Sequence, residues 1–402
     1  MSEWRKIAIG ELVTLRQGFA INVKSKHYIS KEQTSLALLR IADMKSASRE
    51  IFVKEDIPQN FIAKPQDIIY TRTGNVGLVF RNNYGVVHNN CFTVTPNDEC
   101  ILSRDFLYYL LQSHYFFEKA NSLARGAAQP DLPHTLFNSI EISYPNLDTQ
   151  QRITTILSRY DSLIENYQKQ IKLLEESAQR LYKEWFIDLR FPGHENTKIV
   201  DGVPEGWEKK KLGEIFTFVR GKSYTSKDLA NNGILMINLK NIQAFGGYKR
   251  NAEKRFIGEY KDNQIAYKGD LIMGVTDMTQ ERRLVGHVAL VPDLKEIATF
   301  SMDLIKIIPL RLPTVFLYCA MKYGGISTRI SPLANGVNVL HLKPEAMLGI
   351  ETIIPSMELV SVFTSYTEKT IDKILSLQSQ IRHLTEARDR LLPKLMSGEI
   401  KV

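Results

Sequence analysis

The chain has few cysteines and lacks a long apolar segment. Its 402 residues include three cysteines, Cys91, Cys100 and Cys319, which are scattered and form no CxxC pair. An odd number of isolated cysteines argues against a disulfide framework or a structural zinc site and fits a reducing compartment. No apolar run approaches the ~18–20 residues of a membrane span, and the N-terminal residues contain no signal-peptide core. We therefore expect a cytoplasmic protein with no metal site and no contact with a membrane.

The sequence also lacks the motifs of several catalytic classes. An amino-methyltransferase needs an Asn/Asp-Pro-Pro-aromatic loop for its target base and a Gly-rich turn for the methyl donor, and neither occurs. No GxxxxGK[ST] segment is present to bind nucleotide phosphates. Pro130-Asp131 followed by Glu141-Ile142-Ser143 has Ser where a metal-dependent nuclease carries Lys. We therefore expect no catalytic residues and no cofactor on this chain.

What the chain has instead is an excess of positive charge. Lys and Arg number 52 against 44 Asp and Glu, which gives a formal net charge of +8 at pH 7. A basic balance of this size favours an anionic partner. Hydrophobic residues make up 44% of the chain and charged residues 24%, as in an ordinary globular protein. The length predicts two or three domains.

The chain repeats itself. The segment WRKIAIGELVT that begins at Trp4 returns as WEKKKLGEIFT at Trp207, with Trp, Lys, Gly, Glu and Thr in register at an offset of 203. Later residues match at an offset of 210, from Gln168–Leu181 to Gln378–Leu391. A period of about half the chain is too long for a solenoid and indicates a duplicated unit with internal two-fold pseudo-symmetry. A basic, two-fold-like protein suits a two-part target on DNA.

Each copy begins with short apolar runs separated by Gly, Asn and Asp. Asp67–Tyr70 and Asp270–Met273 match at the offset of 203. Short β-branched runs bounded by turn residues favour a curved β-sheet, and a helix that packs on the sheet gives an α+β globular domain. The expected strands after a loop cover residues 77–80 and 284–291, and the expected helices cover residues 107–111 and 317–321.

Each copy ends in a long helix. Apolar or aromatic residues recur in steps of four and three from Ile153 to Trp185, which is the seam of a coiled coil. The second seam, from Phe363 to Leu395, is weaker because Thr367, Thr370 and Arg388 are polar. A helix of about 33 residues spans about 50 Å and needs a partner, so we expect two long antiparallel coiled-coil helices that separate the globular domains. Two bundle helices without a spacing role are the alternative.

The predicted segments are a first globular domain at 1–147, a central helix at 148–190, a linker at 191–206, a second globular domain at 207–356 and a C-terminal helix at 357–402.

Four features together resemble the specificity subunit of type I restriction–modification systems. They are VPEGW at Val203–Trp207 followed by LGEI, the duplicated domain-then-helix layout, PNLDTQQRI at Pro145–Ile153, and the closing RLLPKLMSGEI at Arg390–Ile400. The resemblance implies two target-recognition domains that each bind one half of a split, asymmetric sequence in double-stranded DNA. It also implies helices that dock two methylation subunits, to which restriction (translocase) subunits are added. In such systems catalysis belongs to the partners, and S-adenosylmethionine is expected on the methylation subunit.

Candidate DNA contacts in the first domain lie on loops that combine Gly with Arg, Lys, Asn or Gln, the residue types that grip phosphates and read bases. Thr71–Asn75 resembles the Ser/Arg-Ser-Gly turn of many relatives, and Ala124–Pro130 resembles the family's Gly-x-x-Gln segment. The candidates are Arg16, Gln17, Lys24, Lys26, Arg40, Thr71, Arg72, Thr73, Asn75, Arg125 and Gln129.

The second domain has candidates at matching places. Its turn after the strand at Asp270–Met273 differs in sequence from the first, as two different half-sites require. The candidates are Arg220, Lys222, Ser223, Tyr224, Asn238, Lys240, Asn241, Thr276, Asp277, Thr279, Gln280, Arg282, Arg283, Asn335 and Asn338.

A competing hypothesis is a coiled-coil interaction scaffold whose basic domains bind proteins and read no DNA sequence. For each candidate, a solvated surface charge is the alternative to a DNA contact. Gly18, Gly221, Gly126 and Gly336 are interpreted as backbone turn residues because glycine relieves close approach and tolerates positive φ. Selection of one bipartite motif from random duplexes in rising salt would decide against the scaffold.

Overall fold

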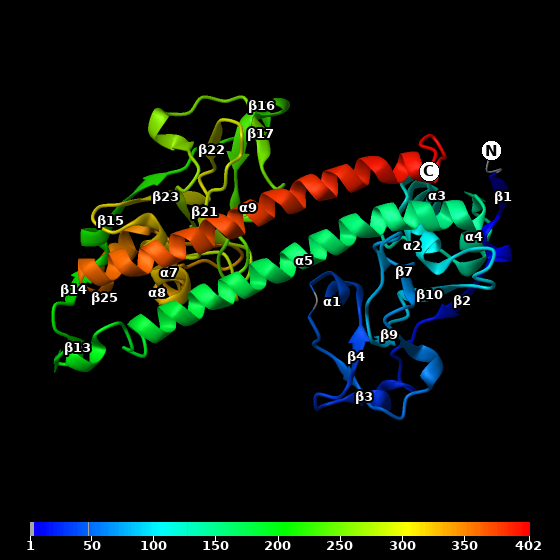
Figure 1. Cartoon of the computed structure of the whole chain (residues 1–402), viewed down its shortest axis with the longest axis horizontal. Coiled ribbons are helices and arrows are strands. Elements are labelled where there is room, and N and C mark those ends of the chain that lie inside the picture. Colours follow the sequence, from blue (N-terminus) through cyan, green and yellow to red (C-terminus); the bar gives the residue numbers. More distant parts are fainter. Residues whose placement is uncertain (1–3, 47, 127) are drawn as a thin grey trace. The chain divides into compact units, whose positions relative to one another are not determined.

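The computed structural model describes residues 4–46, 48–126 and 128–402. The chain divides into two compact units (Figure 1). The first unit is Met1–Asn166 with Ile381–Val402, and the second unit is Tyr167–Gln380. Each long helix contributes residues to both units, since the boundary between the units crosses α5 and α9. The five segments proposed from the sequence stay a prediction.

The first unit is built from short strands and from helices that surround its core. Its aromatic centre is Tyr70, Phe92, Phe116 and Phe137, with Tyr70 stacked on Phe92 at a ring-centroid distance of 5.5 Å. The elements are β1 (Arg5–Ala8), β2 (Val13–Gln17), β3 (Ile29–Ser30), β4 (Leu36–Leu39), α1 (Ile41–Ser46), β5 (Phe52–Val53), β6 (Ile62–Ala63), β7 (Ile68–Thr71), β8 (Val79–Phe80), β9 (Gly85–Val87), β10 (Cys91–Pro96), α2 (Arg104–Gln112), α3 (His114–Leu123), α4 (His134–Asn138), β11 (Glu141–Tyr144) and α5 (Leu147–Phe186), with 3-10 turns η1 (Ile9–Glu11), η2 (Lys26–Tyr28) and η3 (Gln59–Phe61).

The second unit repeats this construction. Phe316 and Phe363 stand at its centre, 5.8 Å apart between ring centroids. Its elements are η4 (His194–Asn196), β12 (Ile199–Val200), β13 (Val203–Pro204), β14 (Glu208–Lys211), α6 (Leu212–Ile215), β15 (Phe216–Arg220), η5 (Ser226–Asp228), β16 (Leu229–Ile237), η6 (Leu239–Asn241), β17 (Lys254–Phe256), η7 (Asp262–Gln264), β18 (Ile265–Ala266), β19 (Leu271–Gly274), β20 (Thr276–Asp277), β21 (Val288–Leu290), β22 (Ala298–Phe300), β23 (Leu304–Pro309), α7 (Thr314–Tyr323), α8 (Ile326–Ile330), η8 (Ser331–Leu333), β24 (Leu340–His341), η9 (Pro344–Gly349), β25 (Glu351–Ile354) and α9 (Met357–Met396).

The main four-stranded sheets of the two units have the same strand order. The order β2-β10-β7-β8 in the first unit corresponds to β15-β23-β19-β21 in the second. The parallel pair β4–β9 corresponds to β16–β22, and the antiparallel pair β1–β11 corresponds to β14–β25. The predicted α+β class and duplication are therefore confirmed. The strand expected over 284–291 is shorter than predicted, since only Val288–Leu290 pairs with β19 and the residues before it form a turn.

The long helices α5 and α9 pack antiparallel within each unit, as predicted. In the first unit the buried residues Ile153 and Leu157 of α5 share a core with Leu395 of α9. In the second unit Trp185 of α5 lies 5.9 Å from Phe363 of α9 between ring centroids. The start of α5 thus meets the end of α9, and the end of α5 meets the start of α9.

The polar seam residues of α9 have specific partners. Arg388 Nη1 donates to Asp161 Oδ1 at 2.8 Å, and the same carboxylate accepts from the Tyr109 hydroxyl at 2.6 Å. Thr367 is buried, and its hydroxyl donates to the Phe363 carbonyl, one helical turn earlier, at 3.0 Å. The side chains of Arg388 and Asp161 are both partly exposed, and their ion pair links α9 to α5 within the first unit.

Candidate nucleic-acid interface

In each unit the first polar loop begins at a glycine, Gly18 or Gly221, whose backbone lies against the backbone of another segment. Gly18 N donates to Cys91 O, and Gly221 N donates to Leu304 O, both at 3.1 Å. A Cβ atom at Gly18 would overlap the His88 carbonyl, and one at Gly221 would overlap the Ser301 carbonyl. Only glycine permits this approach, so the backbone role predicted for these two residues is in agreement with the packing.

The second and third polar loops of the first unit are joined by a short ladder. Asp131 pairs with both Arg125 and Thr73, and Arg125 and Asp131 exchange two backbone hydrogen bonds of 2.8 Å. Leu132 N donates to Arg72 O at 2.9 Å. The turn Thr71–Asn75 is therefore joined to the segment that begins at Ala124, of which Ala127 lies outside the described residues.

The side chain of Arg72 holds these two segments together. Its Nε and Nη2 atoms donate to Asp131 at 3.1 and 2.6 Å, and its Nη1 donates to Gln17 Oε1 at 3.1 Å. Thr73 Oγ1 donates to the same carboxylate at 2.5 Å. The bond from Arg72 lowers the pKa of Asp131 below its usual value. Asp131 was not among the sequence candidates, although it follows Pro130 directly in the family-like segment.

The remaining candidates of the first unit fall into three groups. Arg16 and Arg40 are committed to carboxylates, Arg16 to Asp67 at 3.6 Å and Arg40 to Asp43 at 2.7 Å and Glu50 at 2.6 Å. Thr71 is fully buried, so the DNA contact expected of it is corrected. Its hydroxyl donates to the Asn75 carbonyl and accepts from Leu78 N. The exposed candidates are Lys24, Lys26, Asn75, Arg125 and Gln129.

The second unit builds the same ladder from different residues. His341 pairs with Asn335 and Thr276, and Leu340 pairs with Asp277. Leu342 N donates to Val275 O at 2.8 Å, the counterpart of the bond from Leu132 to Arg72. His341 thus stands where the first unit has Asp131, and Val275 stands where it has Arg72.

A buried carboxylate organises the turn that follows this ladder. Asp277 is fully buried and accepts from Leu284 N at 2.6 Å and Val285 N at 3.2 Å. It also accepts from the amide and hydroxyl of Thr279, both at 2.8 Å. Burial alone would raise the pKa of Asp277, but the hydrogen bonds outweigh burial and lower it. The turn is closed by its own first residue.

Burial corrects four of the expected contacts in the second unit. Asn241 Oδ1 accepts from Asn238 N at 2.9 Å, and Asn238 Nδ2 donates to Ala252 O at 2.6 Å. Thr276 donates to Asp303 at 3.1 Å, and Asp277 closes its turn. These short polar side chains have hydrogen-bond partners inside the fold, as buried polar groups generally do. The four residues that are buried, and not exposed to solvent as expected for DNA contacts, are Asn238, Asn241, Thr276 and Asp277.

Other candidates of the second unit reach the surface. Arg220 donates to both oxygens of Glu345 at 2.6 and 2.8 Å, and the Tyr224 hydroxyl accepts from Lys254 at 2.5 Å. Arg282, with φ 52°, and Lys222 are partly buried. The exposed candidates, apart from Arg220, are Ser223, Lys240, Thr279, Gln280, Arg283, Asn335 and Asn338.

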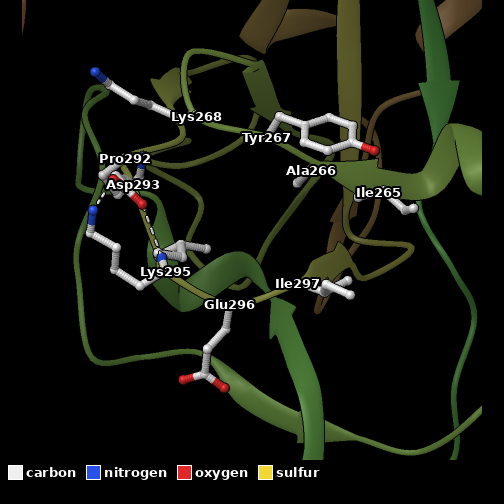
Figure 2. Close-up of a pocket in the computed structure, with 10 residues that line it drawn as sticks. Ile265, Ala266, Tyr267, Lys268, Pro292, Asp293, Lys295, Glu296 and Ile297 are labelled. Carbon is white, nitrogen blue, oxygen red and sulfur yellow. Dashed lines mark hydrogen bonds and ion pairs between the residues drawn. The ribbon is translucent and has the colours of Figure 1, made fainter.

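A separate hollow of about 550 Å³ lies between β18 and the loop at 292–297 of the second unit (Figure 2). Tyr267, Lys268 and Lys295 stand at its rim, and Lys295 pairs with Asp293 at 2.7 Å. None of the residues that line it is a sequence candidate.

Across the described ranges 4–46, 48–126 and 128–402, no group of three or more His, Cys, Asp or Glu could hold a metal ion. In that same part of the chain no helix is long and apolar enough to cross a membrane.

Comparison with known proteins places this fold. The family described as "Type I restriction modification DNA specificity domain" matches residues 1–176 and 204–383, one match for each copy. The chain belongs to this family. The resemblance inferred from the sequence motifs is thereby confirmed, and the chain is a specificity subunit of the type I restriction–modification class.

Individual relatives agree with this assignment. The chain is 28% identical to the type I restriction enzyme MjaIX specificity subunit of Methanocaldococcus jannaschii, over 93% of this chain and 84% of that one. It is 24% identical to the HindI specificity subunit of Haemophilus influenzae over the full length of both. Its fold is similar to that of the type I S subunit from M. genitalium, with a TM-score of 0.61, 20% identity and coverage of 98% and 96%.

Proposed function

We propose that this specificity subunit is a non-catalytic reader of a bipartite, asymmetric DNA site, with one half-site bound by each unit. The observation that carries the proposal is the repeated ladder. Thr73–Asp131–Arg125 and Thr276–His341–Asn335 have the same backbone pairing but different side chains. A constant frame with changed side chains is what recognition of two different base sequences requires, because bases are distinguished by side chains and not by the backbone.

The proposed contacts are the exposed candidates. In the first unit Arg125 and Gln129 lie on the loop that pairs through Asp131 with the turn of Arg72. Arg72 binds Asp131 and is therefore proposed to act as a positioning residue. In the second unit Gln280, Asn335 and Asn338 take the corresponding place. Lysines on the neighbouring loops, Lys24 and Lys26 in the first unit and Lys240 in the second, are proposed to contact phosphates. Affinity should therefore fall steeply as salt rises.

We also propose where the methylation subunits dock. A groove of about 980 Å³ in the first unit is lined by α3, β11 and the end of α9. A groove of about 440 Å³ in the second unit is lined by α8, β25 and the end of α5. Several lining residues of the two grooves correspond: Met396 matches Phe186 and Glu141 matches Glu351 at the offset of 210, and Lys6 matches Lys209 at 203. Two equivalent surfaces favour two copies of one partner. The methylation subunits would carry S-adenosylmethionine, and restriction subunits would join this core.

Co-expression with the cognate methylation subunit, followed by sequencing of modified adenines, tests the proposed reading of DNA. The expected result is one motif made of two unlike halves with a fixed spacer. A continuous motif, or no sequence preference at any salt concentration, would contradict the proposal.

Native mass spectrometry of the same complex tests the grooves. Glu141→Arg reverses a charge in the first groove and Glu351→Arg does so in the second. Each variant alone should lose one partner copy, and the double variant should lose both. Retention of both copies by the double variant would exclude these grooves as the docking surfaces.

A further inference from the structure

Two large apolar side chains are displayed to solvent on adjoining loops of the second unit. Met278 is 78% exposed and Val337 is 88% exposed. Single exposed apolar residues are common on protein surfaces and need no function. These two differ because both lie on loops at the same end of the β20–β24 pair. Met278 directly follows Asp277, and Val337 is three residues before Leu340, the partner of Asp277. Gln280 Nε2 also donates to the Val337 carbonyl at 2.8 Å, which joins the loops.

The loops that display them are held in place by hydrogen bonds on both sides. The turn after Met278 is closed by the buried Asp277 carboxylate through Thr279, Leu284 and Val285. The loop that carries Val337 is closed by the reciprocal backbone bonds between Asn335 and His341, at 3.0 and 2.9 Å. The two exposed side chains therefore lie on turns that hydrogen bonds hold in place.

The polar side chains around them indicate the ligand. Gln280, Asn335 and Asn338 are exposed amides on the same two loops. Amide side chains pair with the N6 and N7 atoms of adenine in the major groove, and thymine is the one base that presents a methyl group there. An A·T pair thus offers an amide partner and an apolar partner side by side. A·T pairs fit this mixed surface better than G·C pairs.

We infer that Met278 and Val337 contact the 5-methyl group of a thymine in the second half-site, read from the major groove. The inference rests on the proposed function, because it presupposes that the second unit reads bases. The first unit provides an internal contrast. Asn75 follows Thr73 by two residues just as Met278 follows Thr276, so a polar side chain stands at the equivalent place. Sensitivity to the thymine methyl through this position is expected in the second half-site alone.

The test replaces thymine by uracil, which removes the methyl group and leaves the hydrogen-bonding edge intact. The full-length chain is titrated with duplexes of its own mapped recognition sequence, each with one second-half thymine replaced by uracil. Wild type should lose about fourfold in affinity at one position, as expected for one buried methyl group. Met278→Ala or Val337→Ala should bind the thymine duplex about fourfold more weakly and be indifferent to uracil there. Met278→Leu should restore the difference, and Asn75→Ala, the matched change in the first unit, should leave it unchanged.

Three results would overturn the inference. They are uracil tolerance at every second-half position in wild type, a second half-site that contains no thymine, and an undiminished uracil penalty in both alanine variants. Each of these presupposes selective binding to a bipartite sequence, so the proposed function would survive them. A wild-type chain with no sequence preference would instead contradict the proposed function itself. Unchanged thermal melting of the variants, expected for exposed positions, establishes that a lost response is not lost folding.

Discussion

The two units share a frame but stabilise their reading loops by different means. In the first unit a partly exposed ion pair, Arg72 with Asp131, joins two loops, and Gln17 completes it. In the second unit a hydrophobic Val275 and His341 take those places, and a buried carboxylate, Asp277, closes the turn from within. Duplication has kept the backbone ladder and replaced the side chains that support it.

This difference shows which parts of the molecule are free to change. The crossing glycines and the ladder are the same in both units because backbone geometry admits few alternatives. The support of the loops is not constrained in this way, since one buried carboxylate or one surface ion pair can each satisfy the local donors. The first unit should therefore respond to changes of surface charge, and the second to the loss of one internal acceptor.

The largest effect is expected from Asp277→Ala in the second unit. The substitution leaves the amides of Leu284, Val285 and Thr279 without their acceptor, so stability should fall by about 2–4 kcal/mol. Hydrogen exchange of these amides and equilibrium unfolding measure the loss. Asp277→Asn should also be destabilising, because its amide nitrogen cannot accept. Thr279→Ala, which removes one hydroxyl, is the control.

Acid should have the same effect on the wild-type turn. Because the pKa of Asp277 is lowered in the folded state, its contribution is complete above the unfolded value near 4 and is lost as pH falls through the lowered pKa. Protection of Leu284 and Val285, corrected for intrinsic exchange rates, should be constant from pH 8 to about pH 5 and decline only well below pH 4. A decline between pH 7 and 5 would contradict the assignment to Asp277.

The next effect should be equal in the two units. Gly18→Ala and Gly221→Ala each force a Cβ atom against a crossing carbonyl, and both should destabilise by about 1–3 kcal/mol. Gly74, at which a Cβ atom would meet nothing, provides a contrast for steric overlap, although its φ of 82° makes substitution strained for another reason. Strongly unequal losses at Gly18 and Gly221 would show that the two frames are not equivalent.

A smaller effect, confined to one half-site, is expected from Arg72→Ala. Loss of the bonds to Asp131 and Gln17 should loosen the loop that carries Arg125 and weaken binding about tenfold, close to 1.4 kcal/mol. Titrations with duplexes altered in the first or the second half measure where the loss arises. Arg72→Lys should not rescue, because an ammonium group cannot make the paired contact. Equal loss for both altered duplexes would show that this positioning role is wrong.

The smallest effect should come from Glu345→Gln in the second unit. Both Glu345 and Arg220 are exposed, so the pair contributes little to folding, and the arginine lowers the pKa of the Glu345 carboxyl. Releasing Arg220 should strengthen binding to random duplex about twofold and steepen its salt dependence by about one phosphate contact. An unchanged salt slope would remove Arg220 from the contact set.

The sequence predicted the parts of the fold that depend on periodicity. The duplication, the seams of α5 and α9, and the loops after Gly18 and Gly221 follow from repeated spacing, and the structure agrees with them. Arg388, which weakened the second seam, pairs with Asp161 of the other long helix, a partner that spacing along one helix does not reveal.

The candidate site was harder to predict because burial is a tertiary property. Asp277 and Asn241 have the residue types of exposed turns, yet both are fully buried and satisfy backbone groups. Arg40 has the type of a phosphate ligand, yet two carboxylates, Asp43 and Glu50, already hold it. Asp131 could not be predicted from the sequence because it contacts Arg72, a residue far away along the chain, and only the tertiary fold brings the two side chains together.

The central claim, one unit for each half-site, is tested most directly by the motif of modified adenines in cells that co-express the methylation subunit. Two variants are compared with wild type, Arg125→Ala with Gln129→Ala in the first unit, and Gln280→Ala with Asn335→Ala in the second. Each should relax base preference in one half-site, a different half for each variant, with the spacer unchanged. Relaxation of both halves by one variant, or of the same half by both, would contradict the account.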